Sequence, residues 1–218
     1  MAAVAFFRFE GVLLARPPVL AAAWLAAQAQ DLPTRFARLA SVALSLPFSM
    51  PGFGDSTTAR RLAWSGVRGF SEDRLEELGA EYRERFIDPN LRPVGLSLVE
   101  QARAEGCSIV LLSDLIGPVA KGLAERIRVD HLICNQLEMV DGRTTGRLID
   151  PVVVGLDGRW ARAWCATNGH DVDHSRAYGA SGDDAVLLAA VGLPCAVFPD
   201  RDLRRVARDC QWPIVDGV

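Results

Sequence analysis

Charged side chains follow an apolar segment near the start of the chain. Arg8 and Glu10 stand at the end of the run Ala5–Phe9, which is typical of a buried strand that passes into a loop. In α/β proteins the carboxyl ends of such strands carry the chemistry. A guanidinium such as Arg8 can bind a phosphate or a carboxylate, and a carboxyl such as Glu10 can donate or accept a proton. We therefore expect a ligand site at this strand end.

Two later predicted strands also end in polar residues. The first of them is a short, continuous apolar run, as for a strand buried on both faces. The polar residues are Ser113, after Ser108–Leu112, and Ser181, Asp183 and Asp184, after Ser175–Tyr178. We expect Asp114, next to Ser113, to cap a following helix.

The side chain of Arg8 has two interpretations. It could form a structural ion pair with Glu10 or Asp184, which we favour because buried charges need partners, or it could bind an anion.

The remaining pattern alternates strands with short helices over residues 91–218. Such alternation is typical of a doubly wound, largely parallel sheet. Asp141-Gly142 lies at the centre of Leu137–Leu148 and indicates a hairpin. Further strands are predicted at His131–Cys134 and Cys195–Phe198. Helices are predicted at Gly95–Glu105, Pro118–Arg126, Arg159–Thr167, Ala185–Val191 and Arg201–Asp209.

Residues 15–90 show helical periodicity and no strand signal. We therefore predict an all-helical cap at 15–90, inserted after the first strand, and a core domain made of 1–14 and 91–218. A Pro- and Gly-rich segment interrupts the cap between predicted helices. It is too apolar for a plain surface loop. Core packing against the other cap helices is the first interpretation, a partner or dimer surface the second, and peripheral membrane contact the third. The apolar residues of the segment are Leu44, Leu46, Phe48, Met50 and Phe53.

Composition limits the partners. The chain has 218 residues and a net charge of −3, so no basic surface for nucleic acid is indicated. Neither a secretory signal nor an apolar stretch long enough for a membrane span is recognised, and we expect a cytoplasmic protein without an integral membrane segment. The five cysteines are widely spaced, and we expect them to be reduced. His170 and His174 match no metal-ligand spacing that we can justify.

Several segments resemble one family in the same order along the chain. They are similar to the haloacid dehalogenase (HAD) superfamily, in its phosphoserine-phosphatase-like branch (subfamily IB-like). The opening Phe6–Leu13 resembles the motif Phe-Phe-Asp-x-Asp-Gly-Thr-Leu, and Ile109–Ser113 resembles the second motif. Asp141–Arg147 resembles the Asp-Gly-x-x-Thr-Gly hairpin, and Tyr178–Asp184 the Asp-Ser-x-x-Asp loop. The resemblance implies a HAD-like, Rossmann-like core with a helical cap.

The resemblance also implies a catalytic set that this chain lacks in part. The family uses a first Asp as the nucleophile, a second as the acid/base, a Lys for the phosphate, and loop carboxylates for Mg²⁺. Here Arg8 stands at the first Asp, Glu10 at the second, and Ala180 at a metal-binding Asp. Gly158 or Arg159 occupies the place of the lysine, and Lys121 is the only lysine of the chain. The catalytic motifs are thus degenerate.

These departures lead us to expect a pseudophosphatase, which is more a binding protein than an enzyme. We expect it to bind a small anion or a protein partner and not to catalyse Mg-dependent phosphoryl transfer. The first alternative is a phosphomonoester hydrolase of the family with altered or residual activity. The second is a non-catalytic subunit that pairs through its cap, and a homodimer is left open. No cofactor is expected for a pseudophosphatase. Mg²⁺ is expected only under the hydrolase alternative. The expected ligand-binding residues are Arg8, Glu10, Ser113, Arg159, Ser181, Asp183 and Asp184.

Overall fold

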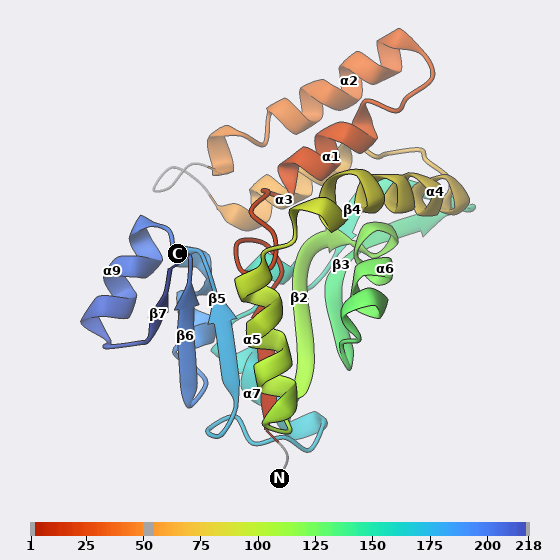
Figure 1. Ribbon diagram of the computed structural model, residues 1–218. Helices are drawn as coiled ribbons and strands as arrows, with labels where there is room; N and C mark the ends of the chain where they lie inside the picture. Colours follow the sequence, from red (N-terminus) through yellow and green to blue (C-terminus); the bar gives the residue numbers. More distant parts are fainter. Residues whose placement is uncertain (1–2, 50–54, 217–218) are drawn as a thin grey trace.

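A seven-stranded sheet forms the centre of the protein. The computed structural model describes residues 3–49 and 55–216 (Figure 1). The strand order is β4-β3-β2-β1-β5-β6-β7, and every neighbouring pair is parallel except the hairpin β3–β4. The predicted α/β sheet and its hairpin are therefore confirmed. The strands are β1 (Val4–Arg8), β2 (Ser108–Ile116), β3 (His131–Val140), β4 (Arg143–Ile149), β5 (Arg176–Gly179), β6 (Leu193–Val197) and β7 (Ile214–Val215).

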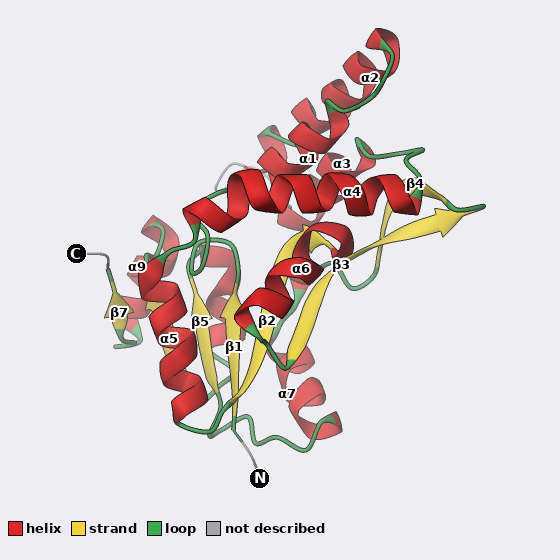
Figure 2. Ribbon diagram, turned by 45° about the vertical axis from the view of Figure 1, so that its right-hand side comes forward, coloured by secondary structure: helices red, strands yellow, loops and turns green. Residues whose placement is uncertain are grey.

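Helices cover both faces of the sheet (Figure 2). Successive residues of β1 point to opposite faces, as the period of a strand requires. Phe7 stacks on Tyr178 at 4.3 Å, in the core shared with α5 and α6, whereas Phe6 contacts Trp160 and Trp164 of α7 on the other face. The fold is thus doubly wound. The helices are α5 (Pro93–Ala104), α6 (Gly117–Ile127), α7 (Gly158–Thr167), α8 (Ala185–Leu188) and α9 (Arg201–Asp209).

Four helices lie beyond the carboxyl ends of the central strands (Figure 1). Three of them begin at polar caps, because Asp31, Asp55 and Ser71 accept hydrogen bonds from the backbone N–H groups of the first turns. The helical nature predicted for 15–90 is confirmed within the described ranges, and the division into two domains stays a prediction. The four helices are α1 (Val19–Ala26), α2 (Leu32–Ala43), α3 (Ser56–Ser65) and α4 (Glu72–Tyr82).

Short turns of other types connect these elements. A 3-10 turn, η1 (Pro47–Ser49), follows α2, and a π-helical turn, η2 (Arg83–Ile87), leads into η3 (Asp88–Asn90). Two more 3-10 turns lie on the core side, η4 (Val153–Gly155) and η5 (Gly182–Asp184). No helix in the described part of the chain is both long and apolar enough to cross a membrane. The cytoplasmic location stays a prediction.

The core-packing interpretation of the segment after α2 is wrong for its described residues. Leu44 is 64% exposed, Leu46 52% and Phe48 39%. The turn η1 contacts α3, but these three side chains stay exposed. Met50 and Phe53 lie outside the described residues.

Candidate active site

Arg8 is the last residue of β1 and lies inside the protein, 5% exposed. Its Nε lies 2.8 Å from Asp184 Oδ1, and its Nη2 donates to Asp114 Oδ2 at 3.3 Å. Burial alone lowers the pKa of Arg8, but the charges of Asp114, Asp184 and Glu10 outweigh burial and raise its pKa. The ion pair predicted with Asp184 is present, and a permanent cation occupies the strand end.

Glu10 is held by the end of β2. Its Oε1 accepts a hydrogen bond from Ser113 Oγ at 2.8 Å, and both of its carboxylate oxygens lie 3.1 Å from the backbone N–H of Asp114. Burial raises the pKa of Glu10 to about 7, with a further rise from the Asp114 charge that Arg8 opposes. This carboxyl is therefore divided between its protonated and ionised forms near neutral pH, the condition in which a group transfers protons best.

Asp114 does not cap a helix, contrary to our expectation. It continues β2, is 1% exposed, and accepts hydrogen bonds from both Arg8 and Arg60, whose Nε lies 3.1 Å from Asp114 Oδ2. Its backbone carbonyl accepts hydrogen bonds from Trp64 Nε1 at 3.1 Å and from Asn135 Nδ2 at 2.7 Å. Two arginines thus neutralise this buried carboxylate, at a place where the register between β2 and β3 shifts between Ser113 and Ile116. The sequence signal for this role was the unusual acid directly after Ser113.

Helix α3 brings the cap onto this strand edge. Arg60 and Trp64 both bind Asp114, and Ser56 Oγ donates to Asp183 Oδ2 at 2.7 Å. The N-terminal half of α3 therefore spans from the end of β2 to the loop after β5. Arg60 was missed from the sequence, because only the fold shows that the inserted helix reaches the first two strands.

The loop after β5 closes the other side. Asp184 Oδ2 accepts hydrogen bonds from the backbone N–H groups of Ala180 at 2.8 Å and Ser181 at 3.0 Å, which forms a capping box for η5. Gly11 has a φ of +87°, and a Cβ placed there would lie 2.3 Å from the Cβ of Ala180. The loops after β1 and β5 are therefore in close contact, and only glycine fits at position 11.

These residues surround a cavity of about 310 Å³. Four arginines line it, and within the described ranges Arg16 and Arg92 form no ion pair, unlike Arg8 and Arg60. Arg92 donates to the carbonyl of Gly11 at 2.7 Å and lies 4.1 Å above the ring of Phe198, whereas Arg16 lies 5.6 Å from the ring centre of Phe86. The lining also includes Glu10, Asp114, Ala180, Ser181, Asp183, Asp184 and Asp200.

The predicted residues do not all meet here. Arg8, Glu10, Ala180, Ser181, Asp183 and Asp184 line the cavity, and Ser113 reaches it through Glu10. The structure does not bring Arg159 to this group. Its side chain is 88% exposed and pairs with Asp157 at the start of α7. Lys121 pairs with Glu76 on the surface, so neither basic residue replaces the lysine that the resemblance implies.

The carboxylates of the site do not suit Mg²⁺. Hard divalent cations need clustered oxygen ligands, and here the Arg8 guanidinium lies among them, 2.8 Å from Asp184 Oδ1. Asp183 Oδ2 accepts a hydrogen bond from Ser56 Oγ, and residue 180 is an alanine, whose side chain has no ligand atom. Within 3–49 and 55–216 no group of three or more His, Cys, Asp or Glu side chains could hold a metal ion.

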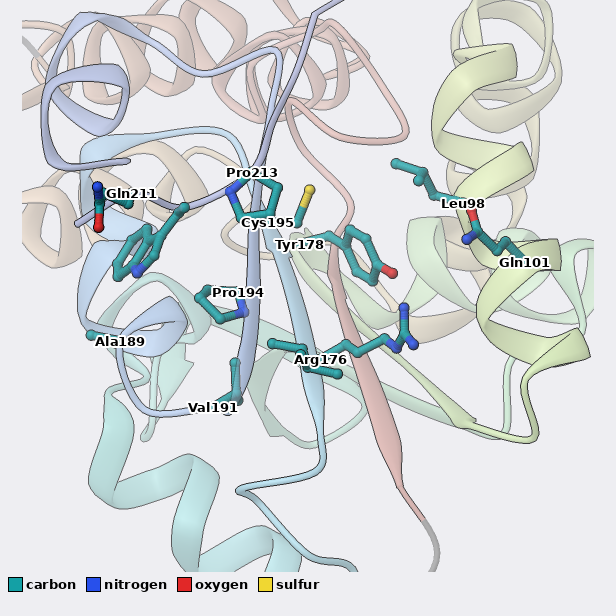
Figure 3. Close-up of a pocket in the computed structure, with 13 residues that line it drawn as sticks. Leu98, Gln101, Arg176, Tyr178, Ala189, Val191, Pro194, Cys195, Gln211 and Pro213 are labelled. Atoms are coloured by element: carbon teal, nitrogen blue, oxygen red, sulfur yellow. The ribbon is translucent and has the colours of Figure 1, made fainter. Parts of the chain in front are cut away.

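A larger cavity of about 640 Å³ lies elsewhere (Figure 3). It opens on the face of β5 and β6 that α5 only partly covers, and Arg176, Tyr178 and Cys195 point into it. Burial raises the pKa of Cys195 to about 11, so its thiol is not poised as a nucleophile. Since no group poised for proton transfer lines this cavity, we assign the active site to the smaller one.

The sequence is similar to a family of hydrolases. Residues 5–188 match the family model described as haloacid dehalogenase-like hydrolase. The chain is 31% identical over 150 residues to the "inhibition of morphological differentiation protein" of Streptomyces azureus, covering 68% of this chain and 54% of that protein. It is 28% identical over 163 residues to the phosphoserine phosphatase SerB1 of Mycobacterium tuberculosis, covering 74% and 53%. The chain thus spans about half the length of these relatives.

A solved structure shows the same fold. A substrate-bound phosphoserine phosphatase complex superposes with a TM-score of 0.72 at 14% identity, covering 99% of this chain and 93% of that one. The interpretation as a pseudophosphatase is wrong, because relatives named as phosphatases and the hydrolase family model favour the hydrolase alternative. It took the joint loss of the nucleophile, a metal-binding Asp and the phosphate-binding lysine as the loss of activity, although Glu10 keeps a carboxyl on the wall of the cavity.

Proposed function

Because the chain belongs to the haloacid dehalogenase-like hydrolase family, we propose that it is a phosphomonoester hydrolase in which Glu10 transfers protons. One observation carries the proposal: a carboxyl with a pKa of about 7 lies on the wall of a cavity lined by four arginines. Relatives named phosphoserine phosphatase and histidinol-phosphatase favour small phosphomonoesters of alcohols as substrates.

Arg16 and Arg92 are the groups available to bind the phosphate. Arg8 and Arg60 are already neutralised by Asp114 and Asp184, whereas Arg16 and Arg92 have no carboxylate partner in the described ranges. Both guanidinium groups lie over aromatic rings, which limits their conformational freedom without consuming their charge. Burial lowers the pKa of Arg92, but an arginine stays protonated in water at any physiological pH.

Glu10 supplies the chemistry. Residue 8 is an arginine and cannot form an acyl phosphate, so we assign the attack to a water molecule. In the ionised form Glu10 takes a proton from that water as its oxygen attacks phosphorus. The ester P–O bond breaks, and the alcohol leaves with a proton from Glu10 or from solvent. Ser113 and the Asp114 backbone N–H fix the carboxyl in place throughout.

Arg8 does not contact the substrate in this scheme. Its role is to position the neighbouring carboxylates. It holds Asp114 and Asp184 together at the ends of β2 and β5, where the resembling enzymes are expected to bind Mg²⁺. Since the carboxylates do not suit a divalent cation here, we propose a reaction that does not depend on Mg²⁺. Positive charge beside the phosphate would come from the arginine side chains instead.

The test is release of inorganic phosphate from a panel that contains an aryl phosphate, phosphoserine and histidinol phosphate. We expect turnover that EDTA does not abolish, and a loss of about 100-fold or more in kcat for Glu10→Gln. The matched control is Glu100→Gln, which removes an exposed carboxyl of α5 that pairs with Arg103. If the purified protein hydrolyses no member of the panel, or if both variants keep full activity, the proposed function is incorrect.

A further inference from the structure

An apolar strip runs along the outer side of helix α2. Leu32, Phe36, Ala40, Leu44 and Phe48 recur at intervals of four residues and are all exposed, with Phe36 at 71% and Leu32 at 63%. Four-residue spacing places α2 side chains on one helix face, and the strip continues through the following turn into η1. Ala37 and Ala43 are exposed beside it. Helix α2 thus turns its apolar face away from the protein.

The strip carries no charge. The two basic residues of α2 are turned toward the cap: Arg35 donates to the carbonyl of Ala29 at 2.9 Å, and Arg38 donates to the carbonyl of Arg68 at 2.7 Å and lies over Phe70. An interfacial membrane helix normally presents its basic residues beside the apolar face, where they reach anionic headgroups. The engaged arginines of α2 therefore disfavour an anionic membrane, and an apolar protein surface fits better.

The arrangement of large and small residues is self-complementary. Ala40 lies at the middle of the strip, with large residues at both ends and small ones beside it. If two such helices cross antiparallel at Ala40, the small residues allow close approach, and Phe36 of each copy meets Leu44 of the other. Antiparallel helices also align their dipoles favourably. A two-fold interface requires a surface that is complementary to itself after a rotation of 180° about its centre. The order of large and small residues in the strip meets this requirement.

The available area is sufficient. The large residues of the strip, Leu32, Phe36, Leu44 and Phe48, expose between 39% and 71% of their surface. With about 200 Å² for each whole residue, these four alone offer roughly 500 Å² per copy. The exposed alanines and prolines between them bring the strip close to the ~800 Å² per partner that a stable interface buries. The largest apolar patch on a typical monomer covers about 300–600 Å², so this strip lies at the upper end of that range or beyond it.

We propose that the protein is a homodimer in which the α2 strips of two copies pack antiparallel about a two-fold axis at Ala40. The active sites lie on the core side of each cap and stay separate from this interface. The proposal does not depend on the phosphatase activity, because it rests on the outer surface of α2 alone.

Mass measurement in solution tests it. Across a concentration series into the high micromolar range, light scattering should give about 47 kDa, twice the 23.6 kDa chain mass, and Phe36→Glu should give the monomer. Phe36 is 71% exposed, so this variant should fold, which circular dichroism checks. The matched control is Val186→Glu on α8, where the side chain is 61% exposed, and this variant should stay dimeric.

A cross-link tests the geometry. In a Cys210→Ser background, which removes the exposed native thiol, Ala40→Cys should form a covalent dimer on mild oxidation because residue 40 faces its own copy. Ala166→Cys on the exposed side of α7 should not. A wild type that is monomeric throughout overturns the proposal, as does a dimer that Phe36→Glu leaves intact. Binding of monomeric wild type to phosphatidylglycerol vesicles, abolished by Phe36→Glu, would assign the strip to a membrane instead.

Discussion

Replacing Glu10 by Gln should change how the stability of the protein depends on pH. The pKa of Glu10 is about 7 in the folded protein against an ordinary value of 4.5, because burial and the Asp114 charge favour the protonated form. The folded state therefore binds more protons than the unfolded state between these two values. The favourable contribution of Glu10 to the free energy of unfolding is fully present below about pH 4.5 and is lost as the pH rises to about 7.

The magnitude follows from the same two values. At 1.36 kcal/mol per pKa unit the full difference corresponds to about 3 kcal/mol, and since Glu10 is partly exposed to solvent we expect about 2 kcal/mol. Gln can still accept the hydrogen bonds from Ser113 and the Asp114 N–H, but it does not titrate. The free energy of unfolding of wild type minus that of Glu10→Gln should thus fall by about 2 kcal/mol between about pH 5 and about pH 8.

Urea unfolding of both proteins at four pH values across this range measures the difference. Titrating groups that do not interact with Glu10 contribute equally to the two proteins and cancel. The control is Glu100→Gln, whose difference from wild type should not change with pH by more than a few tenths of a kcal/mol, since Glu100 lies on the surface. A Glu10→Gln difference that is constant, or that rises with pH, would refute the assignment of the raised pKa to this residue.

Further predictions concern the neighbours of Glu10. Arg8→Met leaves Asp184 buried without its cation and Asp114 paired with Arg60 alone, and it should lower the free energy of unfolding by about 3 kcal/mol in urea titrations. Arg92→Gln should raise KM for phosphomonoesters about tenfold or more, with a smaller effect on stability, in steady-state assays. Gly79→Ala should destabilise, because a Cβ there would lie 2.3 Å from the carbonyl oxygen of Pro118, and a shift in thermal midpoint measures this.

Much of the fold could be predicted from the sequence, because its signals are local. The continuous apolar runs of β1 and β2, the turn at Asp141-Gly142 and the capped start of α4 at Ser71 each specify an element within a few residues. The order of family-like motifs then specified the topology. The strand β2 was predicted too short, since the pattern breaks at Ser113 and Asp114, and only Arg8 and Arg60 make a buried acid tolerable there.

The site was predicted in part. Arg8, Glu10 and Asp184 were brought together by the parallel strands that carry them, as sequence order and sheet geometry imply. Arg60 and Arg92 could not be found, because their place depends on how the cap and α5 pack against the strand ends. Arg159 was assigned by alignment alone, and its helix points the side chain to solvent. The function was misjudged because motif positions show which residue is missing but not the pKa of the residue that remains.

The pH dependence of kcat/KM for phosphomonoester hydrolysis shows whether Glu10 is the catalytic base, since it reports the ionisation of that base in the free enzyme. If Glu10 activates the attacking water, kcat/KM should rise with pH through a pKa of about 7 and then level off, and Glu10→Gln should abolish this rise together with most of the activity. A profile that is flat between about pH 6 and about pH 8, or one that Glu10→Gln leaves unchanged, would contradict it.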